Sequence, residues 1–96
     1  MPARFALGRV VATPGALAAL EKANTNALPL LARHAAGDWG DVDAQDKAAN
    51  DAAIVSGARL LSTYAVGDAV CIWVITEAAD ERGWRASTCV LLPDEY

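Results

Sequence analysis

The second half of the chain contains three apolar segments joined by short polar connections, and this pattern limits the fold more than any other feature. The segments are Leu60–Tyr64, Val70–Thr76 and Ser87–Leu92. Their apolar residues recur at about every second position, which is typical of strands. Gly67–Asp68 supplies a turn between the first two segments, and the charged segment Glu77–Ala86 connects the last two. Because short connections join neighbouring antiparallel strands, we predict a meander with Val70–Thr76 at its centre.

The first half is typical of one strand followed by three short helices. Phe5–Ala12 is apolar and β-branched enough for a strand, and Thr13–Pro14 combines an N-cap with a proline in the first helical turn. A second helix is expected from about Asn26 to Gly37. A third is expected from its cap Asp43 to about Ser56, because Gly57 favours a helix end. The order β-α-α-α-β-β-β predicts a single α+β domain over residues 1–96, with an antiparallel sheet packed against helices.

The charge balance opposes a general affinity for nucleic acid. The sequence has 8 Lys plus Arg against 12 Asp plus Glu, and its formal net charge is −4. Phosphate binding requires Lys and Arg side chains arranged along a surface. We therefore expect a protein partner and no direct contact with nucleic acid.

The sequence indicates neither a membrane segment nor a cofactor. The longest apolar runs, such as Val70–Ile75 and Val90–Leu92, are far shorter than the roughly 20 residues that span a bilayer. The start Met1–Phe5 lacks the features of a secretory signal, so we expect a cytoplasmic protein without a membrane partner. Cys71 and Cys89 lack CxxC spacing and nearby histidines, and are expected to be buried thiols. No glycine-rich phosphate loop occurs, so we predict neither a metal nor a cofactor.

Five aspartates gather in one short stretch that contains a single lysine, Lys47. One interpretation is a solvated loop and helix start whose charges favour the helix dipole. The other is an acidic face that binds a basic protein surface, since charge complementarity selects partners and speeds their association. A calcium loop is disfavoured because the spacing differs from DxDxDG and no terminal Glu follows. The hypothesis of a protein-binding face includes the loop tryptophan and comprises Asp38, Trp39, Asp41, Asp43, Asp46 and Asp51.

The three tryptophans lie in different contexts. Trp39 lies in a predicted loop, where it either covers one end of the core or anchors an interface, because Trp is frequent among binding hot spots. Trp73 lies inside an apolar strand and is expected to pack in the core. Trp84 lies in the charged connection before the last strand and is expected to be the most exposed of the three.

His34 is the only histidine and therefore the first candidate for acid or base catalysis near neutral pH. An alternative function is a small RNase or toxin that uses His34 with Arg59 near the substrate phosphate. The simpler account is a histidine at the C-terminal end of a helix, where a positive charge favours the dipole. Neither cysteine lies in an electropositive context, so a cysteine enzyme is not predicted.

The order and spacing of short motifs along nearly the whole chain are similar to those of a family of small uncharacterised proteins found on bacterial plasmids and other mobile elements. Members of that family have a shorter link before the last strand, so Ala79–Arg85, which includes Trp84, resembles an insertion. The motifs that carry the resemblance are Phe5–Gly8, Ala12–Leu17, Arg33–His34 with Gly37–Gly40, Asn50, Arg59–Ser62 with Tyr64, Ile72–Trp73 with Ile75–Ala78, and Leu91–Pro93 with Glu95–Tyr96.

The resemblance implies a biological context more than an activity. Small acidic proteins of mobile elements often counter host defence by binding a restriction or CRISPR effector where nucleic acid should bind. Context alone does not establish a function. Together with the charge argument, it favours a non-enzymatic protein that binds a basic surface of a host protein, as a monomer or a homodimer.

Overall fold

A computed structural model describes residues 2–96 and contains one four-stranded sheet. The strands are β1 (Arg9–Ala12), β2 (Leu60–Val66), β3 (Val70–Thr76) and β4 (Ser87–Leu91), in the spatial order β1-β4-β3-β2. The predicted meander of the last three strands is confirmed, because β2 pairs antiparallel with β3 and β3 pairs antiparallel with β4. The α+β class is therefore confirmed.

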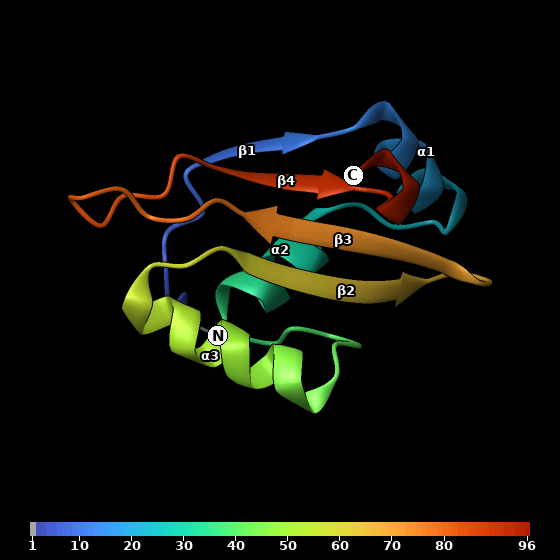
Figure 1. The fold of residues 1–96 in the computed structure, drawn as a ribbon. Helices are drawn as coiled ribbons and strands as arrows, with labels where there is room; N and C mark the ends of the chain where they lie inside the picture. Colours follow the sequence, from blue (N-terminus) through green and yellow to red (C-terminus); the bar gives the residue numbers. More distant parts are fainter. Residues whose placement is uncertain (1) are drawn as a thin grey trace.

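The prediction of a wholly antiparallel sheet is wrong at β1, which runs parallel to β4 (Figure 1). These two strands lie far apart along the chain, so no short turn fixes their relative direction. The first strand is also shorter than the predicted segment Phe5–Ala12. It begins after Gly8, which has a φ of 65°, and a Cβ at Gly8 would collide with the main chain of Arg85 and Ala86.

The helices are α1 (Pro14–Lys22), α2 (Leu28–Ala35) and α3 (Ala44–Ser56), and a short 3-10 turn η1 (Pro93–Glu95) lies near the C-terminus. The Thr13 hydroxyl accepts a hydrogen bond from the N–H of Ala16, as an N-cap should. The Asp43 carboxylate accepts one from the N–H of Asp46, and Gly57 ends α3 with a φ of 85°. These predicted helix ends are confirmed, whereas α2 begins two residues later than Asn26.

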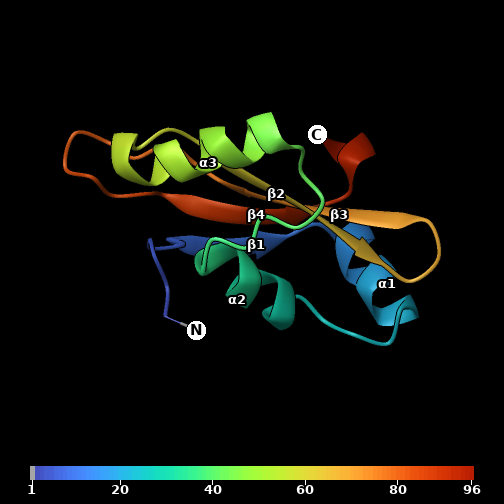
Figure 2. The same cartoon turned by 90° about the horizontal axis from the view of Figure 1, so that it is seen from below.

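Helices α1 and α2 cover one face of the sheet, and α3 lies along its β2 edge (Figures 1 and 2). Alternate strand residues such as Tyr64, Ile72 and Val90 point to the helix-covered face and form the main core with Leu20 and other helix residues. Figure 2 shows α3 and η1 on the side opposite α1 and α2, with α3 at the β2 edge. In the part of the chain that the structure describes, no α-helix runs across the middle of this second face, which we call the open face. None of the described helices is long and apolar enough to cross a membrane.

The side chains on the open face depart from two expectations. Trp73 is half-buried there, and its ring contacts that of Tyr96 at 5.8 Å, so the prediction of core packing is met only in part. Cys71 is exposed and Cys89 is half-buried, and both are free thiols. The expectation of buried thiols is therefore wrong, because odd-numbered residues of β3 and β4 point away from the helices.

Asn50 of α3 closes the outer edge of β2. Its amide donates to the carbonyl of Leu61 at 2.7 Å and accepts from the N–H of Leu61 at 3.2 Å. Asn50 is 6% exposed, so both groups of Leu61 would lose their partner in a poorly solvated place if the amide were removed. We expect Asn50→Ala to lower the free energy of unfolding by about 2 kcal/mol.

Urea unfolding measures this effect, and Gln45→Ala is the matched control on the exposed surface of the same helix. The control should change stability by less than about 0.5 kcal/mol. Equal stability of the two variants would show that the Asn50 amide does not hold α3 against the sheet.

Candidate functional site

Trp39 lies in the core and not on the surface. Its side chain is 3% exposed and packs with Ala53 and Leu60, while its ring stacks on Phe5 at 6.0 Å between centroids. The indole N–H donates to the carboxylate of Asp51 at 2.9 Å. Of the two interpretations of this tryptophan, the structure supports the one in which it covers an end of the core. The role of direct interface anchor is corrected accordingly, because a partner has no access to the ring.

Two of the candidate carboxylates have cationic partners inside the molecule. Asp38 accepts from Arg33 at 2.8 and 3.3 Å and from the N–H of Gly40 at 3.2 Å. The hydrogen bond from Arg33 holds the pKa of Asp38 below its usual range. Asp51 accepts from Trp39 and from Lys47 at 3.0 Å, and both bonds lower the pKa of Asp51. These two aspartates stabilise the loop and α3.

The other three aspartates form an exposed acidic surface, which we define as Asp41, Asp43 and Asp46. Asp43 caps α3 through one oxygen, and no ion pair within residues 2–96 involves any of the three. The backbone beneath them is fixed, because the N–H of Asp41 donates to the carbonyl of Thr63 at 2.7 Å. The fold therefore presents three carboxylates from a rigid support.

His34 is completely buried at the centre of a polar chain. Its Nδ1 lies 2.5 Å from the Ser62 hydroxyl, and its Nε2 lies 2.8 Å from the Thr76 hydroxyl. The Thr76 hydroxyl lies 2.7 Å from that of Thr88, and Thr88 donates to the carbonyl of Leu7 at 2.7 Å. All of these side-chain groups have partners.

The direction of each bond follows from the last acceptor in the chain. Because Thr88 gives its only proton to a carbonyl, Thr76 must donate to Thr88. The Thr76 oxygen must then accept from His34 Nε2–H, so Nδ1 is unprotonated and accepts from Ser62. Burial, together with the charge of Arg85, lowers the pKa of His34 from 6.5 to about 4. The histidine is therefore neutral near pH 7.

This environment corrects the simpler account of His34. The residue does lie in the last turn of α2, but a neutral imidazole does not favour the helix dipole as a cation would. Burial of a charged imidazole at this site costs more free energy than the helix dipole returns, as the lowered pKa of His34 indicates. The rings of Phe5 and Trp39 lie 5.3 and 5.6 Å from the imidazole and enclose it further.

The structure does not bring the two residues of the alternative enzyme function together. His34 belongs to α2, on the helix-covered side of the sheet, and is 0% exposed. The Arg59 guanidinium bonds to the hydroxyl of Tyr96, whose ring contacts Trp73 on the open face. A substrate phosphate at Arg59 would therefore be separated from His34 by the sheet. The Ser62 hydroxyl donates to His34, as a nucleophile does to its general base, but both side chains are buried and a substrate cannot reach them.

Arg85 is a structural residue that the sequence analysis did not identify. Its side chain is 8% exposed and donates to the carbonyls of Ala53, Ala58 and Glu77 at 2.8 to 2.9 Å. Ala53 belongs to the last turn of α3, which has no basic residue of its own. Burial lowers the pKa of Arg85. In the sequence, the only hint of this role is that the last turn of α3 lacks a basic residue. That hint does not identify which arginine supplies the positive charge.

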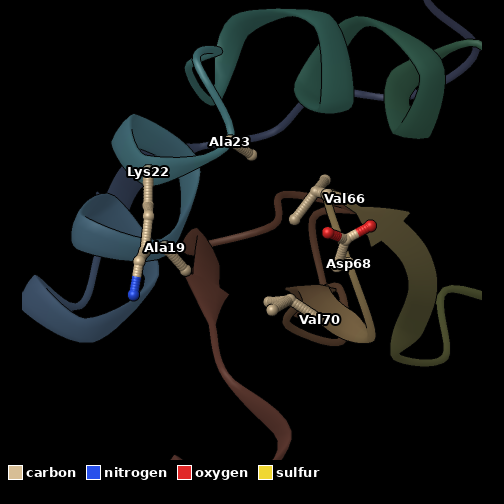
Figure 3. Close-up of a pocket in the computed structure, with 7 residues that line it drawn as sticks. Ala19, Lys22, Ala23, Val66, Asp68 and Val70 are labelled. Carbon is tan, nitrogen blue, oxygen red and sulfur yellow. The ribbon is translucent and has the colours of Figure 1, made fainter.

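The surface formed by residues 2–96 includes two clefts of several hundred cubic ångströms. The larger, about 500 Å³, separates the C-terminal end of α1 from the β2–β3 turn (Figure 3). Its walls are mostly small and apolar, and Lys22 and Asp68 lie on opposite sides without forming an ion pair. The smaller, about 420 Å³, lies between the N-terminal segment, the end of α3 and the last hairpin. Neither cleft contains His34 or any residue of the acidic surface.

Neither a metal-binding group of side chains nor a similar known protein points to another functional site. No group of three or more His, Cys, Asp or Glu side chains among residues 2–96 is placed to hold a metal ion. Comparison of the chain with known proteins gives no matching family, curated protein or solved structure. Membership in the family of small mobile-element proteins therefore stays a prediction.

Proposed function

We propose that the protein is a non-enzymatic interaction protein that binds a basic surface of a host protein through the acidic surface Asp41, Asp43 and Asp46. The observation that carries the proposal is that these carboxylates are exposed, without ion pairs in the described chain, and held on a rigid support. Asp38 and Asp51 hold the neighbouring loop and α3 in place, because Arg33 and Lys47 already neutralise their charges. Trp39 supports the acidic surface by packing beneath α3.

The kind of partner follows from the chemistry. A surface that normally holds nucleic acid carries lysines and arginines along a phosphate path, and three neighbouring carboxylates can oppose it. With the resemblance to proteins of mobile elements, this favours a host defence effector, for example a restriction or CRISPR complex, as the target. An inhibitor of this kind requires no catalytic group and no cofactor.

The test compares two variants with equal loss of charge in affinity capture from a bacterial host. Asp41→Asn with Asp46→Asn removes two charges from the acidic surface and leaves the helix cap Asp43 intact. Glu21→Gln with Glu81→Gln removes two exposed charges elsewhere. We expect the first pair to weaken capture of a specific partner by about tenfold or more, while the second pair retains it.

Raising the salt concentration should weaken the same interaction, because screening acts over roughly 8–10 Å at physiological ionic strength. Equal retention by both double variants would contradict the acidic surface as the binding site. Equal loss would show that only the net charge matters.

A further inference from the structure

We propose that the protein forms a two-fold symmetric dimer in which β1 pairs antiparallel with β1 of a second copy. The two edges of the sheet differ in how their outward main-chain groups are bonded. At the β2 edge, both main-chain groups of Leu61 bond to the Asn50 side chain. Both groups of Thr63 bond to the loop, through the carbonyl of Trp39 at 3.1 Å and the N–H of Asp41 at 2.7 Å. Within residues 2–96, Ala65 alone among the outward-facing residues of β2 has no such partner, so a second strand cannot pair along the length of this edge.

The β1 edge has no such cover. The N–H of Arg9 donates to the carbonyl of Ala86, just before β4, at 3.0 Å, and the N–H of Thr13 donates to the carbonyl of Val90 in β4 at 2.9 Å. Between them, Val11 is in register with Cys89. In a parallel ladder, alternate residues bond to the same neighbour. The N–H and C=O groups of Val10 and Ala12 therefore point outward, and no side chain or loop within residues 2–96 bonds them there.

The side chains at this edge are also those of a pairing strand. Val10 and Val11 are 45% and 41% exposed, and Leu17 of the following helix is 50% exposed. Edges of monomeric proteins are protected by a very short strand, by charged side chains, or by a proline, a bulge or an inward-pointing charge. The strand Arg9–Ala12 is short, at 4 residues, and carries one charge, on Arg9, but it contains no proline and its two valines leave most of the edge apolar.

A second copy satisfies this edge better than an unrelated strand, because the pattern of outward groups is self-complementary. With the two Val11 residues opposite each other, Val10 of each copy exchanges two hydrogen bonds with Ala12 of the partner subunit. Four bonds then satisfy every outward group of both strands. Val11 faces Val11 of the partner subunit in the closely spaced, non-hydrogen-bonded position.

Charge complementarity supports the same register. Arg9 would lie opposite Thr13 of the partner subunit. Within each copy, the Thr13 hydroxyl donates to the Glu95 carboxylate at 2.6 Å, so a carboxylate lies next to the position that Arg9 reaches. The symmetry creates this arginine–carboxylate arrangement twice. Since each copy has one open edge, assembly ends at two copies and an eight-stranded sheet, without forming a filament.

The first experiment measures mass in solution by light scattering over a range of concentrations. We expect a dimer for the native chain and at least about tenfold weaker dimerisation for Val11→Lys, which places two like charges opposite each other. Val55→Lys is the matched control, because Val55 is 91% exposed on α3, away from the β1 edge. It should remain dimeric. Val10→Pro should also be monomeric with an unchanged circular dichroism spectrum, because its N–H takes no part in the fold.

The second experiment tests the register by disulfide cross-linking. Val11→Cys in a Cys71→Ser, Cys89→Ser background should form a covalent dimer on oxidation, because Cα atoms at such a position lie about 4.5 Å apart. Val55→Cys in the same background should not. A monomer at every concentration would overturn the proposal, and so would a dimer that persists equally in Val11→Lys and Val10→Pro. Neither result bears on the acidic surface, which is separate from β1.

Discussion

Replacing Trp39 by alanine is expected to lower the free energy of unfolding by about 3–5 kcal/mol, the usual range for a buried tryptophan. The indole contributes the packing of Phe5, Ala53 and Leu60 at one end of the core, and its N–H bonds to Asp51. The variant would leave a cavity and would remove a donor from a carboxylate. Against a typical stability of about 5–15 kcal/mol, a loss of this size leaves a marginal fold.

Chemical denaturation followed by circular dichroism measures the loss, and Trp84→Ala is its matched control. Trp84 is 73% exposed, which confirms the expectation that it is the most exposed tryptophan. Its replacement should change stability by less than about 0.5 kcal/mol. If Trp39→Ala were as stable as Trp84→Ala, the ring would have to be at the surface, and its role as an interface anchor would return. If Trp39→Ala is the less stable variant, then any partner that it fails to bind is lost because the protein unfolds, and not because Trp39 contacts that partner.

Local signals in the sequence predicted the elements well. The Thr13–Pro14 start, the Asp43 cap and the Gly57 stop each act within one helical turn, so they depend on nearby residues alone. The strands after α3 were also predictable, because their alternation and short turns are properties of neighbouring residues. The direction of β1 depends on a partner far along the chain, and no local pattern encodes it.

The candidate site was predictable only as a set of charges. Spacing along the sequence placed Asp38 to Asp51 in one region, but it could not separate the two aspartates that form ion pairs within the molecule from the three that do not. That division depends on where Arg33, Lys47 and Trp39 point. His34 illustrates the same limit, because its neutral state arises from Ser62 and Thr76, which the fold brings from two strands of the sheet.

Acidification is expected to destabilise the protein between pH 6.5 and about 4 through His34. The pKa of His34 is about 4 in the folded protein and 6.5 without the fold, so in this interval only the unfolded chain takes up the proton. Stability therefore falls as the pH falls, because protonation favours the unfolded state. Above pH 6.5, His34 is unprotonated in both the folded and the unfolded states, so it causes no loss of stability there. The difference between the two pKa values corresponds to about 3 kcal/mol by pH 4.

Urea midpoints near neutral pH and at about pH 4.5 test this in the native chain and in His34→Gln. Glutamine can donate to Thr76 and accept from Ser62 but does not titrate, so its stability should change little over the interval. Asp38 and Asp51 have lowered pKa values, and their loss of stabilisation begins near pH 4 and below, outside most of the window. An equal acid response in the two proteins would mean that His34 takes up its proton at the same pH in the folded and the unfolded states. The directed hydrogen-bond chain from Ser62 to Leu7 would then have to be reversed or broken, because a doubly protonated imidazole cannot accept from Ser62.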